Sequence, residues 1–178
     1  VSNVKNLSGL PMSAPVTLEG GYSSMSYIVL NPSGTATAYA TVSTDGKYTL
    51  HAVGGDYWGF SEAGCLYLNE EVEGDFDVVL CVEYIENNHE WTKVGLAFRS
   101  TLDANSQHVS MLATPSRVQA TCRPSAGVDS IELTSSNTGS VTYPSNWIRL
   151  KRVGDLITAY RSLDGNYWTY VATADAGT

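Results

Sequence analysis

The feature of this chain that most restricts its fold is an alternation of apolar and polar residues with a period of two. In the segment 76–84, apolar or aromatic side chains stand at every second position, and Val94, Leu96 and Phe98 repeat the pattern. No segment keeps a period of 3.6 over ten residues, so an amphipathic helix has no support. The pattern therefore predicts an all-β protein with less than about 10% helix.

Turn residues divide this pattern into short strands. The pairs Asp45-Gly46 and Asp164-Gly165 and the triplet Val153-Gly154-Asp155 are typical of hairpin turns, because glycine supplies the positive φ that tight turns need. Short strands about ten residues apart predict a two-sheet antiparallel β-sandwich. The strands are expected at 16–18, 27–30, 36–42, 47–52, 76–84, 93–99, 107–113, 117–122, 131–134, 147–152, 156–162 and 168–172.

The length of 178 residues corresponds to one domain, which can bury roughly 70% of its unfolded surface without metals or disulfides. We expect a single domain over 1–178 with its core in 47–174. Residues 1–45 carry almost no charge after Lys5, and they are expected to form outer strands or an arm that docks on a neighbouring subunit.

The formal charge of −8 opposes nucleic acid and anionic lipid as partners. No run approaches the ~20 apolar residues of a membrane span, which argues against membrane insertion. Charged residues make up only 16% of the chain, and Ser, Thr, Gly, Asn and Tyr take their place. This exchange favours an extracellular, cell-surface or virion-surface protein. The N-terminus shows no basic segment followed by an apolar one, so a signal sequence was either removed or never present.

Three cysteines, Cys65, Cys81 and Cys122, cannot all pair within one chain. Cys81 and Cys122 fall inside apolar strand patterns, which favours free thiols, while one disulfide plus an odd cysteine stays open. The cysteines form no C-x-x-C pair and the three histidines are scattered, so no zinc site is expected.

Several motifs recur in a fixed order along the chain. They are the turn Gly54-Gly55-Asp56-Tyr57-Trp58-Gly59, the strand start Gly74-Asp75-Phe76, the W-x-K-x-G-L-x-x-R strand from Trp91 to Arg99, the later Arg123, and the W-I-R-L-x-R-x-G hairpin from Trp147 to Gly154. In this order they resemble a bacterial branch of the concanavalin A-like lectin/glucanase superfamily, close to laminin-G-like domains. The resemblance implies a jelly-roll β-sandwich and leaves the activity open.

Lys93, Arg99 and Arg123 carry charge inside apolar strands, where a charge is costly unless it is paired and hydrogen-bonded. Two interpretations follow: an internal network that ties a sheet to the glycine-rich turn, or a shallow polar groove with aromatic walls, as in sugar recognition. The candidate ligand-binding residues are Asp56, Tyr57, Trp58, Tyr67, Trp91, Lys93, Arg99 and Arg123.

The acidic run around Glu73, Asp75 and Asp77 raises the alternative of a glycosidase, which needs two carboxylates. The run lacks the second Glu of the E-x-D-x-x-E strand of the related glucanases, and Asp75 is expected to be structural. No nucleophile or phosphate-binding motif stands out, so no catalytic residue and no metal ligand is assigned.

The hairpin of residues 162–168 resembles the Asp-box of sialidases, one residue short, and is expected to be a structural turn. No cofactor is expected, although loop carboxylates such as Asp103, Asp129 and Asp155 leave calcium open.

We therefore expect a non-catalytic binding module of a secreted or surface-displayed protein, with a glycan or polysaccharide as its partner. The alternative is a structural subunit, a decoration or fibre protein of a virion or cell surface, whose Tyr-rich faces contact a protein partner or further copies of the chain. A glycoside hydrolase is the third hypothesis. The 11 tyrosines and 4 tryptophans fit either kind of partner, because these side chains combine a ring with a polar group.

Overall fold

The computed structural model describes residues 16–17, 27–30, 38–63, 65–68, 71–133 and 140–176, without the side chains of 16–17, 27–30 and 65–68. Every regular element in these ranges is a β-strand, which confirms the all-β prediction. The same ranges contain no helix that could cross a membrane.

The larger of the two main sheets has five strands in the order β1-β6-β11-β12-β13. β1 runs parallel to β6, and the other neighbours are antiparallel. Its strands are β1 (Val16–Thr17), β6 (Phe76–Val82), β11 (Asn146–Val153), β12 (Leu156–Ser162) and β13 (Thr169–Asp175).

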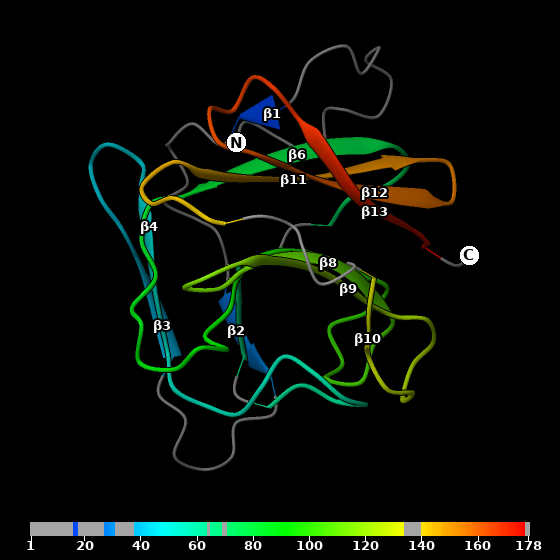
Figure 1. The fold of residues 1–178 in the computed structure, drawn as a ribbon. Helices are drawn as coiled ribbons and strands as arrows, with labels where there is room; N and C mark the ends of the chain where they lie inside the picture. The colour runs from blue at the N-terminus through cyan, green and yellow to red at the C-terminus, as the bar shows by residue number, and fades with distance from the viewer. Residues whose placement is uncertain are drawn as a thin grey trace.

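The second main sheet has four antiparallel strands in the order β10-β9-β8-β7. They are β7 (Val94–Arg99), β8 (His108–Ala113), β9 (Val118–Arg123) and β10 (Ile131–Glu132). This sheet packs face to face with the five-stranded sheet, mainly through β11 against β7 and β8 (Figure 1).

The core between the sheets confirms the alternation predicted for β6, since Phe76 and Val82 are buried in it and Val78 and Leu80 pack against it. Apolar side chains of both sheets contribute, among them Val109, Met111, Val118, Ala120, Ile148, Leu150, Ile157 and Ala159. Removing these side chains from water stabilises the fold, at about 25 cal/mol per Å² of apolar surface.

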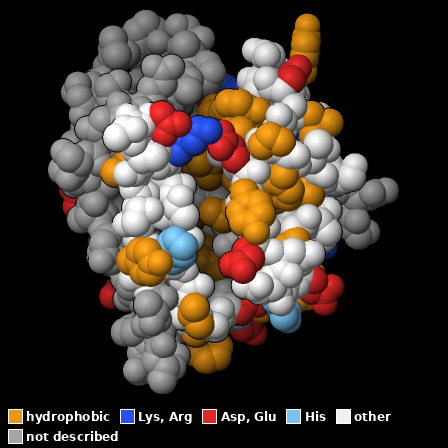
Figure 2. All heavy atoms as spheres, turned by 90° about the vertical axis from the view of Figure 1, so that its left-hand side faces the viewer, with side chains coloured by type: hydrophobic (Ala, Val, Ile, Leu, Met, Phe, Trp, Pro, Cys, Tyr) orange, Lys and Arg blue, Asp and Glu red, His pale blue; other side chains and the backbone are white. Residues whose placement is uncertain are grey.

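Two further pairs of strands complete the described fold. β2 (Tyr27–Leu30) pairs with β5 (Cys65–Leu68), and β3 (Ala38–Val42) pairs with β4 (Tyr48–Ala52). β5 was missed by the sequence analysis. The β3–β4 hairpin exposes most of its side chains, and Figure 2 shows this side of the molecule with a hollow bordered by hydrophobic groups.

The predicted hairpin turns are confirmed. Gly46, Gly154 and Gly165 have φ of 82°, 59° and 74° between β3 and β4, β11 and β12, and β12 and β13. Cys81 and Cys122 are free thiols, as expected, and burial raises the pKa of both. The side chain of Cys65 lies outside the described residues.

Every residue of β8 and β9 is buried, although only alternate side chains can face the core. The other side chains of these strands must therefore be covered from outside. Figure 1 shows the loop of residues 53–63, in cyan, on the side of this sheet that faces away from the five-stranded sheet. The fold thereby brings loop and sheet together over a set of polar residues.

Candidate functional site

Three basic side chains form one row across the outer face of the four-stranded sheet. The strand register places Arg99 of β7 opposite His108 of β8, and His108 opposite Arg123 of β9. β8 therefore lies between the strands that carry Arg99 and Arg123. Arg123 and His108 are almost fully buried, so their polar atoms need partners inside the protein.

Glu62 supplies the negative charge for this row. Its Oε1 accepts a hydrogen bond of 2.7 Å from Arg123 Nη1, and its Oε2 accepts one of 3.1 Å from Arg99 Nη2. The Glu62 side chain has 0% exposure. A carboxylate shared by two guanidinium groups is strongly oriented, because charge-assisted hydrogen bonds hold both of its oxygens.

The two arginines also fix the backbone of two different loops. Arg123 donates to the carbonyl oxygens of Gly59 at 2.8 Å and Ser106 at 2.9 Å, and Arg99 donates to the carbonyl of Asp103. Ser130 N donates to Gly59 O at 2.9 Å, which adds the loop after β9. The loops at 54–63, 100–106 and 124–130 are thus held together at one end of the sheet.

His108 is the neutral member of the row. Burial, together with the charges of Arg123 and Arg99, lowers the pKa of His108 to about 3. The Ser130 hydroxyl donates to Gly59 O, so it accepts from His108 Nε2 at 3.3 Å, and Nδ1 then accepts from Ser110 Oγ at 3.0 Å. Tyr57 Oη lies 2.6 Å from Ser110 Oγ and extends the chain to the loop.

A second ion pair holds the start of the loop. Lys93, just before β7, pairs with Asp56, and its side chain is nearly buried while that of Asp56 is exposed. Trp91 lies beside this pair, with Lys93 Nζ 5.6 Å and Arg117 Cζ 4.4 Å from its ring centroid. These cations take up part of the ring surface that a ligand would need.

The predicted residues therefore separate into two groups. Tyr57, Lys93, Arg99 and Arg123 are buried or nearly so, and for the three basic residues the structure shows the internal network rather than an open polar groove. Asp56, Trp58 and Trp91 are exposed at the surface. The side chain of Tyr67 lies outside the described residues.

Three members of this site were missed from the sequence. Glu62 is the second acid of the 54–63 segment, and the need of two buried arginines for a counter-charge was the signal that could have found it. Phe60, which is 64% exposed, follows Trp58 in the same loop, where Trp58 is 37% exposed. His108 gave no sequence signal, because a single histidine in a strand has no characteristic spacing.

Two carboxylates of the acidic run are engaged in contacts within the protein. Asp75 Oδ1 accepts from Gly154 N at 2.8 Å, and Asp77 is buried beside Arg149. Glu73 is exposed. Within the described ranges, no group of three or more His, Cys, Asp or Glu side chains could hold a metal ion, so the calcium alternative gains no support there.

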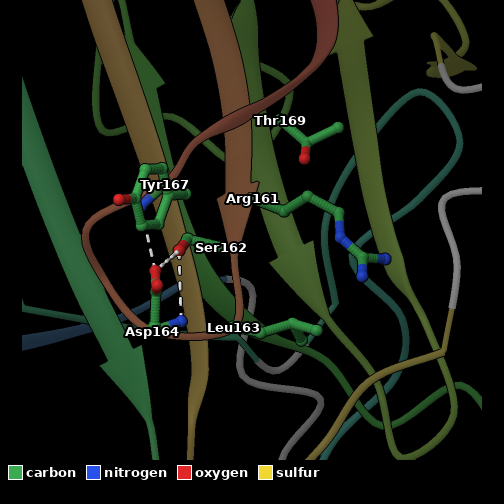
Figure 3. Close-up of a pocket in the computed structure, with 6 residues that line it drawn as sticks. All are labelled: Arg161, Ser162, Leu163, Asp164, Tyr167 and Thr169. Carbon is green, nitrogen blue, oxygen red and sulfur yellow. Dashed lines mark hydrogen bonds between the residues drawn. The ribbon is translucent and has the colours of Figure 1, made fainter.

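The hairpin that resembles an Asp-box borders a pocket of about 240 Å³ (Figure 3). Asp164 accepts hydrogen bonds from the backbone of Tyr167 at 2.9 Å and Asn166 at 2.8 Å and from Ser162 Oγ at 2.9 Å, and these bonds lower its pKa. Figure 3 shows Arg161 pointing away from Asp164. Asp164 is thus used within its own turn, which agrees with the structural interpretation.

The chain was compared with models of protein families, with curated proteins and with solved structures, and none of the three comparisons found a match.

Proposed function

We propose that this chain is a non-catalytic carbohydrate-binding module, built on a jelly-roll sandwich of the concanavalin A and laminin-G type, in a secreted or surface-displayed protein. The observation that carries the proposal is the buried Arg99–Glu62–Arg123 cluster, which fixes the loop that presents Trp58 and Phe60. Sugars stack their C–H faces on such rings. A loop that is already ordered loses little entropy when it binds.

The absence of catalysis is part of the same proposal. Hydrolysis of a glycosidic bond needs two carboxylates that face the same substrate. Asp75 and Asp77 instead hold neighbouring strands together, and Glu62 is enclosed between two arginines. These contacts support binding without bond cleavage.

The test is a glycan array on the parent chain and on Trp58→Ala. If Trp58 is a stacking platform, its loss should weaken binding by about 1–3 kcal/mol, the size known for bases stacked on aromatic rings. The melting temperature should change little, since the ring is already partly exposed. Tyr84→Ala is the control, because Tyr84 is exposed and belongs to neither the loop nor the cluster.

Two results would contradict the site. Loss of about 3–5 kcal/mol of folding stability in Trp58→Ala would show that the indole is a core residue. Unchanged binding of every glycan by a folded Trp58→Ala protein would remove Trp58 from the ligand surface.

A structural subunit is the second candidate, supported by the β3–β4 hairpin. A two-stranded hairpin has marginal stability alone, and this one exposes Tyr39, Val42 and Leu50, with Val53 after it. Such side chains are typical of protein contacts. Sedimentation velocity separates the two candidates: a glycan-binding monomer favours the module, and a stable oligomer without glycan binding favours the subunit.

A further inference from the structure

The outer face of the five-stranded sheet carries aromatic side chains that the core does not use. The register aligns Arg149 of β11 with Tyr160 of β12, and Tyr160 with Tyr170 of β13. Ile148 and Leu150, on either side of Arg149, face the core, so Arg149 points outward. Tyr160 and Tyr170 belong to the same outer row.

An ion pair holds the centre of this face. Arg149 Nε donates to Asp77 Oδ1 at 2.6 Å, and Nη2 donates to Oδ2. The Asp77 contact also raises the pKa of Arg149. Arg149 Cζ lies 5.3 Å from the ring centroids of both Tyr160 and Trp168, so the guanidinium fixes two rings.

The open part of the face lies over β12 and β13. Tyr170 is 60% exposed, and its ring meets Tyr160 edge to face at 6.3 Å and 82°. Next to this row, Thr158 Oγ1 and Thr173 Oγ1 are 3.1 Å apart. On the β6 side the outer face is covered, because the side chain of Val79 is only 6% exposed. Ordered rings beside hydroxyl groups at an open edge provide both kinds of contact that a sugar needs.

The charges of this face indicate the kind of ligand. Arg149 and Lys151 from β11 stand against Asp77 from β6 and Asp175 from β13, so the formal charges cancel. The whole chain has a formal charge of −8, which repels polyanions. An uncharged polymer buries no unpaired charge of its own when it binds, so it pays no penalty for desolvating a charge. It is also not repelled by the negative charge of the chain.

We propose that Tyr160, Tyr170 and Trp168 form a second glycan-binding surface, which takes an extended neutral polysaccharide by the middle of its chain. This proposal rests on the carbohydrate class proposed above and uses residues remote in sequence from the 54–63 loop. Preference for the middle of a polysaccharide chain follows from exposure, because Tyr170 is 60% exposed on the sheet face and is not enclosed at the end of a pocket.

The experiment is native gel electrophoresis of the full chain through gels that contain hydroxyethyl cellulose or galactomannan. Carboxymethyl cellulose serves as the charged counterpart of the first polymer. The parent should be retarded by at least one neutral polymer and not by carboxymethyl cellulose. Tyr170→Ala should lower the apparent affinity at least tenfold, Tyr170→Phe should keep it because the ring is retained, and Tyr84→Ala should behave as the parent.

The same gels separate the two surfaces. Retardation lost in Tyr170→Ala and kept in Trp58→Ala supports the second surface. Retardation lost only in Trp58→Ala leaves the loop site standing and overturns this one. It is also overturned if no neutral polymer retards the parent, if carboxymethyl cellulose retards it equally, or if sedimentation shows that Tyr170→Ala dissociates a dimer. Thermal melting of each variant verifies that it is folded.

Discussion

Glu62→Gln should strongly destabilise the fold although the substitution is conservative. The side chain keeps its size, but two guanidinium groups lose the counter-charge that lies 2.7 Å from Arg123 and 3.1 Å from Arg99. Breaking a buried ion pair by removing one partner costs about 3–5 kcal/mol, because the remaining charge stays buried and uncompensated. Because two buried cations remain here, we expect the free energy of unfolding to fall by an amount in the upper half of that range.

The assay is urea unfolding followed by tryptophan fluorescence, with the melting temperature as a second measurement. In a chain of this length, a loss of about 4–5 kcal/mol corresponds to roughly 8–20 °C in melting temperature. Glu73→Gln is the matched control, because Glu73 is exposed and its change should stay within about 0.5 kcal/mol. A Glu62→Gln protein as stable as the Glu73→Gln control would refute the role of the cluster.

A double-mutant cycle tests the reason for the loss. In the parent, Arg99→Gln removes a favourable contact with Glu62, whereas in Glu62→Gln it removes repulsion between two buried cations. Arg99→Gln should therefore destabilise the Glu62→Gln protein less than it destabilises the parent. Equal effects in both backgrounds would show that charge is not the cause.

Two further predictions concern stability. The pKa of His108 is about 3 in the folded chain against 6.5 for an ordinary histidine. Between these two pH values the unfolded chain binds more protons than the folded chain. The free energy of unfolding should therefore fall by about 3 kcal/mol from pH 7 to pH 4 because of this group. The unfolding free energy of His108→Gln should lack this part of the slope, and parallel pH profiles of parent and variant would disprove it. Gly95→Ala would place a Cβ in steric clash with the backbone oxygen of Met111, and the free energy of unfolding should fall by an amount toward the upper end of the roughly 1–3 kcal/mol typical of overpacking. Gly154→Ala, with open space but a φ of +59°, should lose only about 1–2 kcal/mol in the same urea assay, and a smaller loss in Gly95→Ala than in Gly154→Ala would contradict the steric argument.

Most of the strands were predictable because their signal is local. The alternation in 76–84 and the turns at Gly46, Gly154 and Gly165 locate β6 and three hairpins without any knowledge of the fold. β5 was missed because Cys65–Leu68 is a short apolar run without alternation. The pairing of β6 with β11 was not predictable either, because it joins two segments that lie far apart in the sequence.

From the sequence it was predictable that the basic residues of the site need partners, but not which residues those partners are. Arg99 and Arg123 had to find a carboxylate, and the 54–63 segment offered both Asp56 and Glu62. The choice between them depends on how far the loop reaches over the sheet. Asp56 meets Lys93 at the surface, and Glu62 meets the two arginines where water is excluded.

The buried cluster also explains why apolar rings can remain exposed nearby. Because both faces of β8 and β9 are covered, Arg123 must find its partners inside the protein, and Gly59 O accepts from both Arg123 and Ser130. That carbonyl lies between Trp58 and Phe60 in the chain, so the atoms that anchor the loop also determine where these rings are presented. Neither ring belongs to the buried core, so their exposure follows from the position in which Gly59 O anchors the loop.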